Sequence, residues 1–107
     1  MNNVKIYHNP RCSKSRQALQ IIKDYGVEPE VIEYLKEPLS RSELENIAKR
    51  LGLRPKDFIR KNEANFKDNN LASKLGKDSD LFEAMAKFPK IMERPIIISD
   101  LGAVIGR

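Results

Sequence analysis

The apolar positions of the chain change their spacing several times, and each change predicts a different element. Residues Val4–Tyr7 are rich in β-branched and aromatic side chains, which is typical of a strand. After an Asn-Pro loop signal, apolar residues at helical spacing predict a helix that begins near Ser13 and ends before Gly26. Glu30–Leu35 predicts a second strand. A strand, a helix and a strand within about thirty residues predict a right-handed crossover between parallel strands.

The segment after Pro38 is predicted to be helical. Ser40 and Glu43 have the spacing of a capping box, and the helix that they begin should end at Gly52. Three further helical signals, the middle one weak and surrounded by Asn, cover residues 55–61, 71–75 and 79–89.

The C-terminal part predicts a β-hairpin. Arg94–Ser99 contains a short apolar run, which predicts a strand buried on both faces, and the residues after it predict a turn and a return strand. Four strands in one mixed sheet, with helices 39–89 inserted between the crossover unit and the hairpin, indicate an α/β protein with a thioredoxin-like fold. We expect one domain over residues 1–107, and the closing helix of that fold would follow Arg107.

Composition narrows the function classes. The net charge is +5, but cations and anions are interspersed, so a small anionic ligand is favoured over a nucleic acid. No stretch approaches the roughly 20 apolar residues of a membrane span, and no apolar N-terminal run suggests secretion. We therefore expect a cytoplasmic protein. A single cysteine excludes an internal disulfide, and with one histidine it makes a metal site unexpected.

The single cysteine, Cys12, lies where the first strand passes into the helix. Unsatisfied N–H groups at a helix start favour a thiolate, and Arg11, Lys14 and Arg16 bring positive charge nearby. These features predict a reactive thiol with a lowered pKa rather than a buried inert cysteine. His8 could act as an imidazolium beside the thiolate, or orient it through hydrogen bonds.

Ser15 occupies the place of the second cysteine of a C-x-x-C motif, so the chain cannot resolve a mixed disulfide by itself. Its hydroxyl could donate to the Cys12 sulfur or to an oxyanion, or be an ordinary residue of the first helical turn. An oxyanion site would need more cations, and the candidates are Arg60, Arg94 and Arg107. Pro95 is a candidate for a cis-proline opposite the cysteine.

Five separated motifs resemble one known family. In chain order these motifs are IYHNPRCSKSRQAL, YL-KEP, FIRKNE, MERPIII and IGR. Together they resemble the ArsC arsenate reductases of the glutathione- and glutaredoxin-coupled type, and most closely their YfgD-like subgroup. The resemblance covers essentially the whole chain and implies the same thioredoxin-like fold.

The resemblance also implies a chemistry. Arsenate would be the substrate, Cys12 the nucleophile, and His8 and Ser15 its helpers. The residues that would bind the oxyanion are Arg60, Arg94 and Arg107. Glutathione would be a co-substrate and glutaredoxin the reducing partner of a monomer with no bound cofactor. Two alternatives remain, a monothiol glutathione-linked oxidoreductase and a regulator of the Spx type that binds RNA polymerase, because the fold alone does not separate them.

Overall fold

The computed structural model describes residues 4–100 and 102–106 as two compact units. The first combines Met1–Glu37 with Arg94–Arg107, and the second is the segment Pro38–Glu93 between them. The predicted helical insertion therefore corresponds closely to the second unit. The expectation of a single domain stays a prediction.

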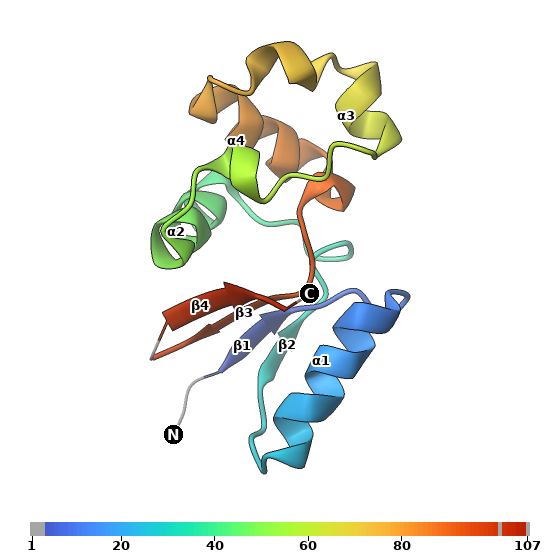
Figure 1. The fold of residues 1–107 in the computed structure, drawn as a ribbon, viewed down its shortest axis with the longest axis vertical. Coiled ribbons are helices and arrows are strands. Elements are labelled where there is room, and N and C mark those ends of the chain that lie inside the picture. Colours follow the sequence, from blue (N-terminus) through green and yellow to red (C-terminus); the bar gives the residue numbers. More distant parts are fainter. Residues whose placement is uncertain (1–3, 101, 107) are drawn as a thin grey trace. The chain divides into compact units, whose positions relative to one another are not determined.

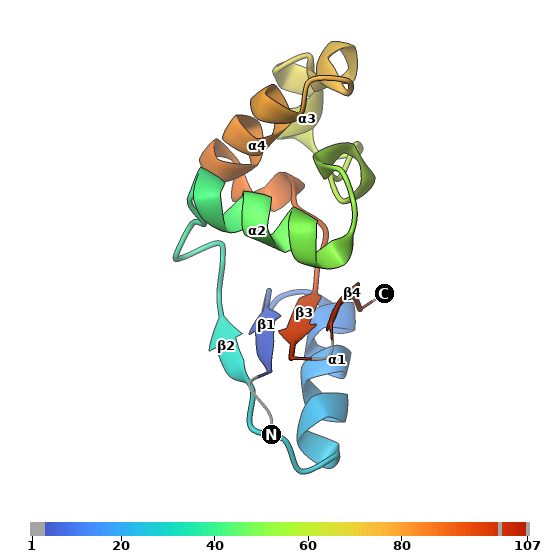
Figure 2. The same ribbon diagram turned by 90° about the vertical axis from the view of Figure 1, so that its left-hand side faces the viewer.

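The first unit is a four-stranded mixed sheet with one long helix. Its elements are β1 (Lys5–Tyr7), α1 (Ser13–Asp24), β2 (Glu30–Ile32), β3 (Ile96–Ser99) and β4 (Gly102–Ile105). The strand order is β2-β1-β3-β4; β1 and β2 are parallel, and β3 is antiparallel to both β1 and β4. Figures 1 and 2 show α1 running alongside this sheet. This topology confirms the predicted thioredoxin-like sheet.

The burial of β3 differs from the prediction of a strand covered on both faces. Ile96 and Ile98 are buried, but the alternate residues Ile97 and Ser99 are only half-buried. Successive side chains of a strand point to opposite faces. A hollow of about 340 Å³ lies on the Ile97 face, where α1 contributes further lining residues. That face is therefore less completely covered than the sequence indicates.

The predicted second strand is too long by three residues. β2 ends at Ile32, and the following residues form a turn in which the backbone N–H groups of Lys36 and Glu37 donate to the carbonyl oxygen of Glu33, both at 2.9 Å. The Glu33 carbonyl oxygen, which a longer strand could pair with its neighbour, is therefore already hydrogen-bonded within the turn. At the other boundary the prediction holds, because Gly26 follows α1 with φ of 80°, a left-handed conformation that favours glycine.

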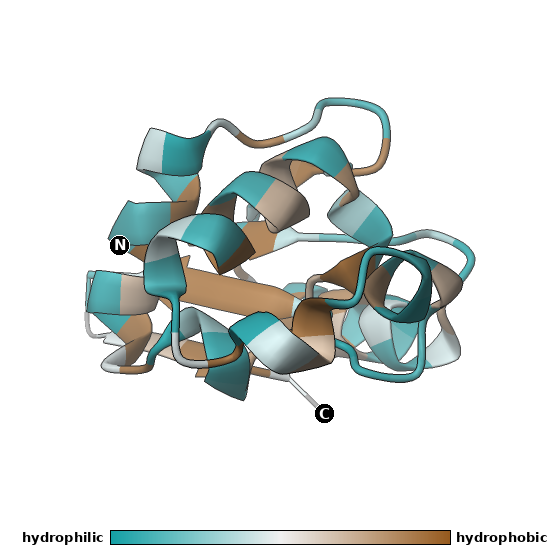
Figure 3. Ribbon diagram, turned by 90° about the horizontal axis from the view of Figure 1, so that it is seen from above, coloured by the Kyte–Doolittle hydropathy of each residue, from teal (hydrophilic) through white to brown (hydrophobic). Residues whose placement is uncertain are grey.

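The second unit is helical. Its elements are α2 (Arg41–Leu51), the 3₁₀ turn η1 (Pro55–Asp57), α3 (Ala64–Asp68), η2 (Leu71–Lys74), α4 (Asp78–Lys87) and η3 (Pro89–Ile91). The predicted capping box is present, since the Glu43 N–H donates to Ser40 Oγ and the Ser40 N–H donates to Glu43 Oε1. Figure 3 shows these helices coloured alternately hydrophilic and hydrophobic, as amphipathic helices should be.

The core of the second unit forms where α4 packs against α2, η1 and η3. The side chains that are almost completely buried here are Leu44, Ile47, Phe58, Leu81, Met85, Ile91 and Met92. Burying a large apolar side chain contributes about 1.5–3 kcal/mol, so this cluster stabilises the unit. None of the helices in the described part of the chain has the length and apolar character that a membrane crossing requires.

Two predictions in this unit need correction. The helix expected over residues 55–61 ends at Asp57, because the next residues pair with 91–93: Arg60 N–H donates to the Ile91 oxygen at 2.6 Å, and Glu93 N–H to the Phe58 oxygen at 2.9 Å. The short helix α3 was not expected, since its surroundings are polar and rich in Asn. One apolar residue, Phe66, anchors it with 5% of its surface exposed.

Candidate functional site

Cys12 lies at the junction of strand and helix that the sequence predicts. It is the N-cap residue of α1, with extended backbone angles (φ −98°, ψ 122°). Its N–H donates to the Asn9 carbonyl oxygen at 3.0 Å, and its own carbonyl oxygen accepts the first helical hydrogen bond, from Arg16 N–H, also at 3.0 Å. We call residues His8–Cys12 the reactive loop. This loop holds the half-buried thiol at the N-terminal end of α1.

A buried hydrogen-bond network lies under the reactive loop. Ser15 is 0% exposed, and its Oγ accepts the Asn9 N–H at 3.0 Å and lies 2.6 Å from His8 Nδ1. A serine hydroxyl has one proton to donate. Since the Asn9 N–H already donates to Oγ, the arrangement that satisfies all three groups has the Ser15 hydroxyl donating to Nδ1. We therefore assign His8 as the neutral tautomer protonated at Nε2.

The pKa of the Cys12 thiol lies below its ordinary value, and this shift is the net result of effects in opposite directions. Burial is the largest and raises the pKa, since it disfavours the anion. The sulfur closes no hydrogen bond of ordinary capping geometry, yet the backbone N–H groups of Ser15 and Lys14 lie close enough to stabilise its anion. The positive charge of Arg94, with hydrogen bonding from its side chain, lowers the pKa further. The stabilising effects together exceed the effect of burial.

The surroundings of His8 favour its neutral form. Burial lowers the pKa of this imidazole, and the charges of Arg16 and Lys23 lower it further, while Glu33 acts in the opposite direction. A neutral ring fits the hydrogen bond from Ser15 assigned above. Of the two roles that the sequence left open for His8, the structure favours hydrogen-bonded orientation over an imidazolium partner.

The start of the segment that leads into β3 brings Arg94 to the thiol. Arg94 is half-buried, and among the described residues its Nε is a buried polar atom without a hydrogen-bond partner. The Arg94-Pro95 peptide bond is cis, as predicted. The Pro95 carbonyl oxygen accepts the Gly106 N–H at 2.8 Å, so the end of β4 is fixed beside the cis-proline.

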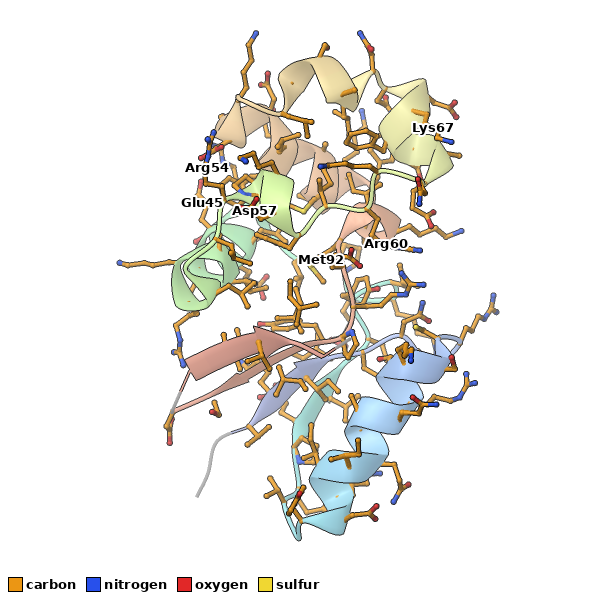
Figure 4. The ribbon with its side chains drawn as sticks, in the orientation of Figure 1. Glu45, Arg54, Asp57, Arg60, Lys67 and Met92 are labelled. Carbon is orange, nitrogen blue, oxygen red and sulfur yellow. The ribbon has the colours of Figure 1, made fainter. Side chains whose placement is uncertain are left out.

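The other two arginines predicted to bind an oxyanion are Arg60 and Arg107. Arg60, which is labelled in Figure 4, belongs to the second unit. Its Nη1 donates to Glu63 Oε2 at 2.7 Å, and its Nε lies 4.0 Å from Glu93 Oε1. Its side chain is 26% exposed. Arg107 lies outside the described residues. The structure thus brings Cys12, His8, Ser15, Arg94 and Pro95 together in the first unit.

The cations next to Cys12 in sequence do not have the role that we expected. The side chains of Arg11, Lys14 and Arg16 are exposed, and Arg94 is the leading cationic influence on the thiol. Lys14 acts through its backbone N–H instead of its charge. Sequence proximity therefore did not identify the cation that lowers the pKa of Cys12, because Arg94 lies far from the cysteine along the chain.

Asn9 is a residue of the site that the sequence patterns do not nominate. Besides its two backbone bonds to Cys12 and Ser15, its side-chain Oδ1 accepts the Arg11 N–H at 3.0 Å. The signal was available, since Asn before Pro is typical of turns in which the Asn side chain caps the backbone two residues on.

In the described part of the chain, no group of three or more His, Cys, Asp or Glu could hold a metal ion.

A family model for the ArsC family matches residues 7–107. The chain belongs to the ArsC family. YfgD of Escherichia coli K12 is 46% identical over 105 residues, which cover 97% of this chain and 88% of that protein. The arsenate reductase of Rhizobium meliloti is 39% identical over 104 residues, covering 97% and 74%.

Solved structures of ArsC relatives agree with the fold. The structure of an arsenate reductase from Vibrio cholerae superposes with a TM-score of 0.94 at 42% sequence identity, covering 98% of this chain and 90% of that one. A protein described as related to the ArsC family, from Bacteroides fragilis, is only 20% identical but still reaches a TM-score of 0.84 over 98% of this chain. The second comparison supports the fold alone.

Proposed function

We propose that this ArsC protein is an arsenate reductase that depends on glutathione and glutaredoxin. The observation that carries the proposal is the pairing of Cys12, a thiol with a lowered pKa, with Arg94, whose buried Nε has no hydrogen-bond partner. A nucleophile beside a cationic donor fits attack on the centre of an oxyanion. Relatives at 36–39% identity carry the name arsenate reductase, which supports arsenate as the oxyanion.

The reaction that we propose begins on the Cys12 sulfur. The thiolate attacks the arsenic atom of arsenate, an As–S bond forms, and one arsenate oxygen leaves as water after protonation. The thiolate of glutathione then displaces a second oxygen as water. A glutaredoxin thiolate attacks the glutathione sulfur, so a disulfide forms and the electron pair of the As–S bond stays on arsenic. Arsenic(V) becomes arsenic(III), and hydrolysis releases arsenite and Cys12.

The neighbouring residues have separate roles in this proposal. Arg94 neutralises the oxyanion and offers N–H donors in a fixed planar fork. Arg60 and Arg107 are proposed as further oxyanion ligands on the basis of the family motifs alone. His8 and Ser15 hold the reactive loop in place. No second thiol is available in the chain, so reduction must come from outside, in a glutathione-containing cytoplasm.

A coupled assay tests the proposal. Purified protein, arsenate, glutathione, glutaredoxin, glutathione reductase and NADPH should show NADPH oxidation that requires arsenate. Cys12→Ser should abolish it, whereas Ser13→Ala, on the exposed side of the first helical turn, should retain it. Thioredoxin with its reductase should not replace glutathione and glutaredoxin. Turnover with thioredoxin alone would refute the proposed partner system.

A second candidate is a monothiol oxidoreductase that acts on glutathione mixed disulfides. The observation in its favour is that Cys12 is only half-buried and can meet a disulfide directly. The same coupled assay separates the two functions when arsenate is replaced by a glutathionylated peptide. Turnover with the peptide, without any response to arsenate, would favour this candidate.

A further inference from the structure

Asn9 makes three hydrogen bonds to the residues around Cys12. Its carbonyl oxygen accepts the Cys12 N–H, its N–H donates to Ser15 Oγ, and its Oδ1 accepts the Arg11 N–H, each at 3.0 Å. The first two bonds are made by the backbone. The third depends on the side chain and therefore on the identity of the residue.

The three bonds of Asn9 connect both sides of the thiol. The bond to Ser15 ties the end of β1 to the first turn of α1, whose N–H groups face the Cys12 sulfur. The bonds to Arg11 and Cys12 close the turn between them. If this turn opens, the sulfur moves relative to the helix N–H groups and Arg94, and its anion loses the stabilisation that opposes burial.

We infer that Asn9 is a positioning residue for Cys12: its side-chain bond to the Arg11 N–H keeps the reactive loop closed and so holds the sulfur beside the first-turn N–H groups of α1 and Arg94. Asn9 contacts neither the substrate nor the sulfur in this scheme. The inference rests on the proposed function only in treating Cys12 as the nucleophile. It concerns thiolate formation, which can be measured without arsenate.

The Asn9→Ala variant tests the inference through the reactivity of Cys12. One neutral hydrogen bond corresponds to about a fivefold change in an equilibrium constant. We expect the iodoacetamide alkylation rate of Cys12 at pH 6.5 to fall about three- to tenfold, and the midpoint of its pH profile to rise by about half a unit or more.

Asn69→Ala is the matched control. Asn69 also bonds the backbone through its side chain, since its Nδ2 donates to the Asn65 carbonyl oxygen at 2.8 Å, but it lies in the second unit at the end of α3. Urea unfolding should show a similar small loss of stability in both variants. Only Asn9→Ala should change the alkylation profile.

The Asn9→Asp variant distinguishes the loss of the side-chain bond that closes the turn from other effects of replacing Asn9. Aspartate keeps the oxygen that accepts the Arg11 N–H, so the loop should stay closed, but its charge raises the pKa of a nearby thiol. High salt screens that charge. Alkylation of Asn9→Asp should therefore recover to within about twofold of the wild type at 1 M salt, while Asn9→Ala should not recover.

Two results would overturn the inference. One is an Asn9→Ala profile that matches Asn69→Ala, and the other is an Asn9→Asp variant that stays as slow as Asn9→Ala in high salt. Failure of the proposed function has a different signature. In that case the alkylation profiles would follow the inference, and the wild-type protein would still show no turnover with arsenate.

Discussion

Replacing Ser15 by alanine should destabilise the protein strongly, although the change removes a single oxygen atom. Ser15 is 0% exposed, and its Oγ joins His8 Nδ1 at 2.6 Å to the Asn9 N–H at 3.0 Å. Alanine would leave both of those groups without a partner. An unsatisfied buried polar group costs about 1–3 kcal/mol, so we expect a loss of about 2–4 kcal/mol in the free energy of unfolding.

Urea unfolding followed by circular dichroism measures this loss, with Ser13→Ala as the control. Ser13 is in the same helical turn but exposed, so its substitution should change the free energy of unfolding by less than about 0.5 kcal/mol. The expected loss in Ser15→Ala is a large part of a typical stability of about 5–15 kcal/mol. A cost no larger than that of Ser13→Ala, with an unchanged slope against urea, would refute the assigned network.

Two further predictions concern pH and packing. Burial lowers the pKa of His8 in the folded protein, so the unfolded chain binds a proton near pH 6.5 that the folded chain does not. Stability should therefore fall as the pH drops below about 6.5, and His8→Gln should flatten that part of the urea-derived profile; an unchanged slope would contradict a neutral buried imidazole. A Cβ at Gly106 would lie 3.1 Å from a proline ring carbon, whereas at Gly76 it would meet nothing within 4 Å. Gly106→Ala should therefore cost more in urea unfolding than Gly76→Ala, and equal costs would count against the described packing.

Most of the fold could be predicted from local patterns. Periodicity and capping signals located the strands, α1, α2 and α4, because each of these elements has its own apolar spacing and its own end signal. The end of the second strand could not be predicted, since the hydrogen bonds to the Glu33 oxygen that form the next turn do not alter the pattern of apolar and polar residues. Helix α3 was missed because one buried residue, Phe66, anchors five residues that are otherwise largely polar.

The candidate site was predictable in its chemistry but not in its contacts. The position of Cys12 before a helix, and the cis bond before Pro95, followed from sequence and from resemblance to a family. Which cation would influence the thiol did not follow. Arg94 is distant in sequence and approaches Cys12 through the pairing of β1 with β3, whereas Arg16, close in sequence, donates from Nη1 to the Pro10 carbonyl oxygen at 2.8 Å.

Helix N–H groups and Arg94 lower the pKa of Cys12 below that of an ordinary thiol, and the proposed chemistry depends on this shift. The most direct measurement is the rate of iodoacetamide alkylation of the single cysteine as a function of pH, in the wild type and in Arg94→Gln. We expect a wild-type midpoint clearly below 8.5, the approximate value of a free thiol, and a higher midpoint in Arg94→Gln. A wild-type midpoint at or above about 8.5, or one that Arg94→Gln leaves unmoved, would contradict it.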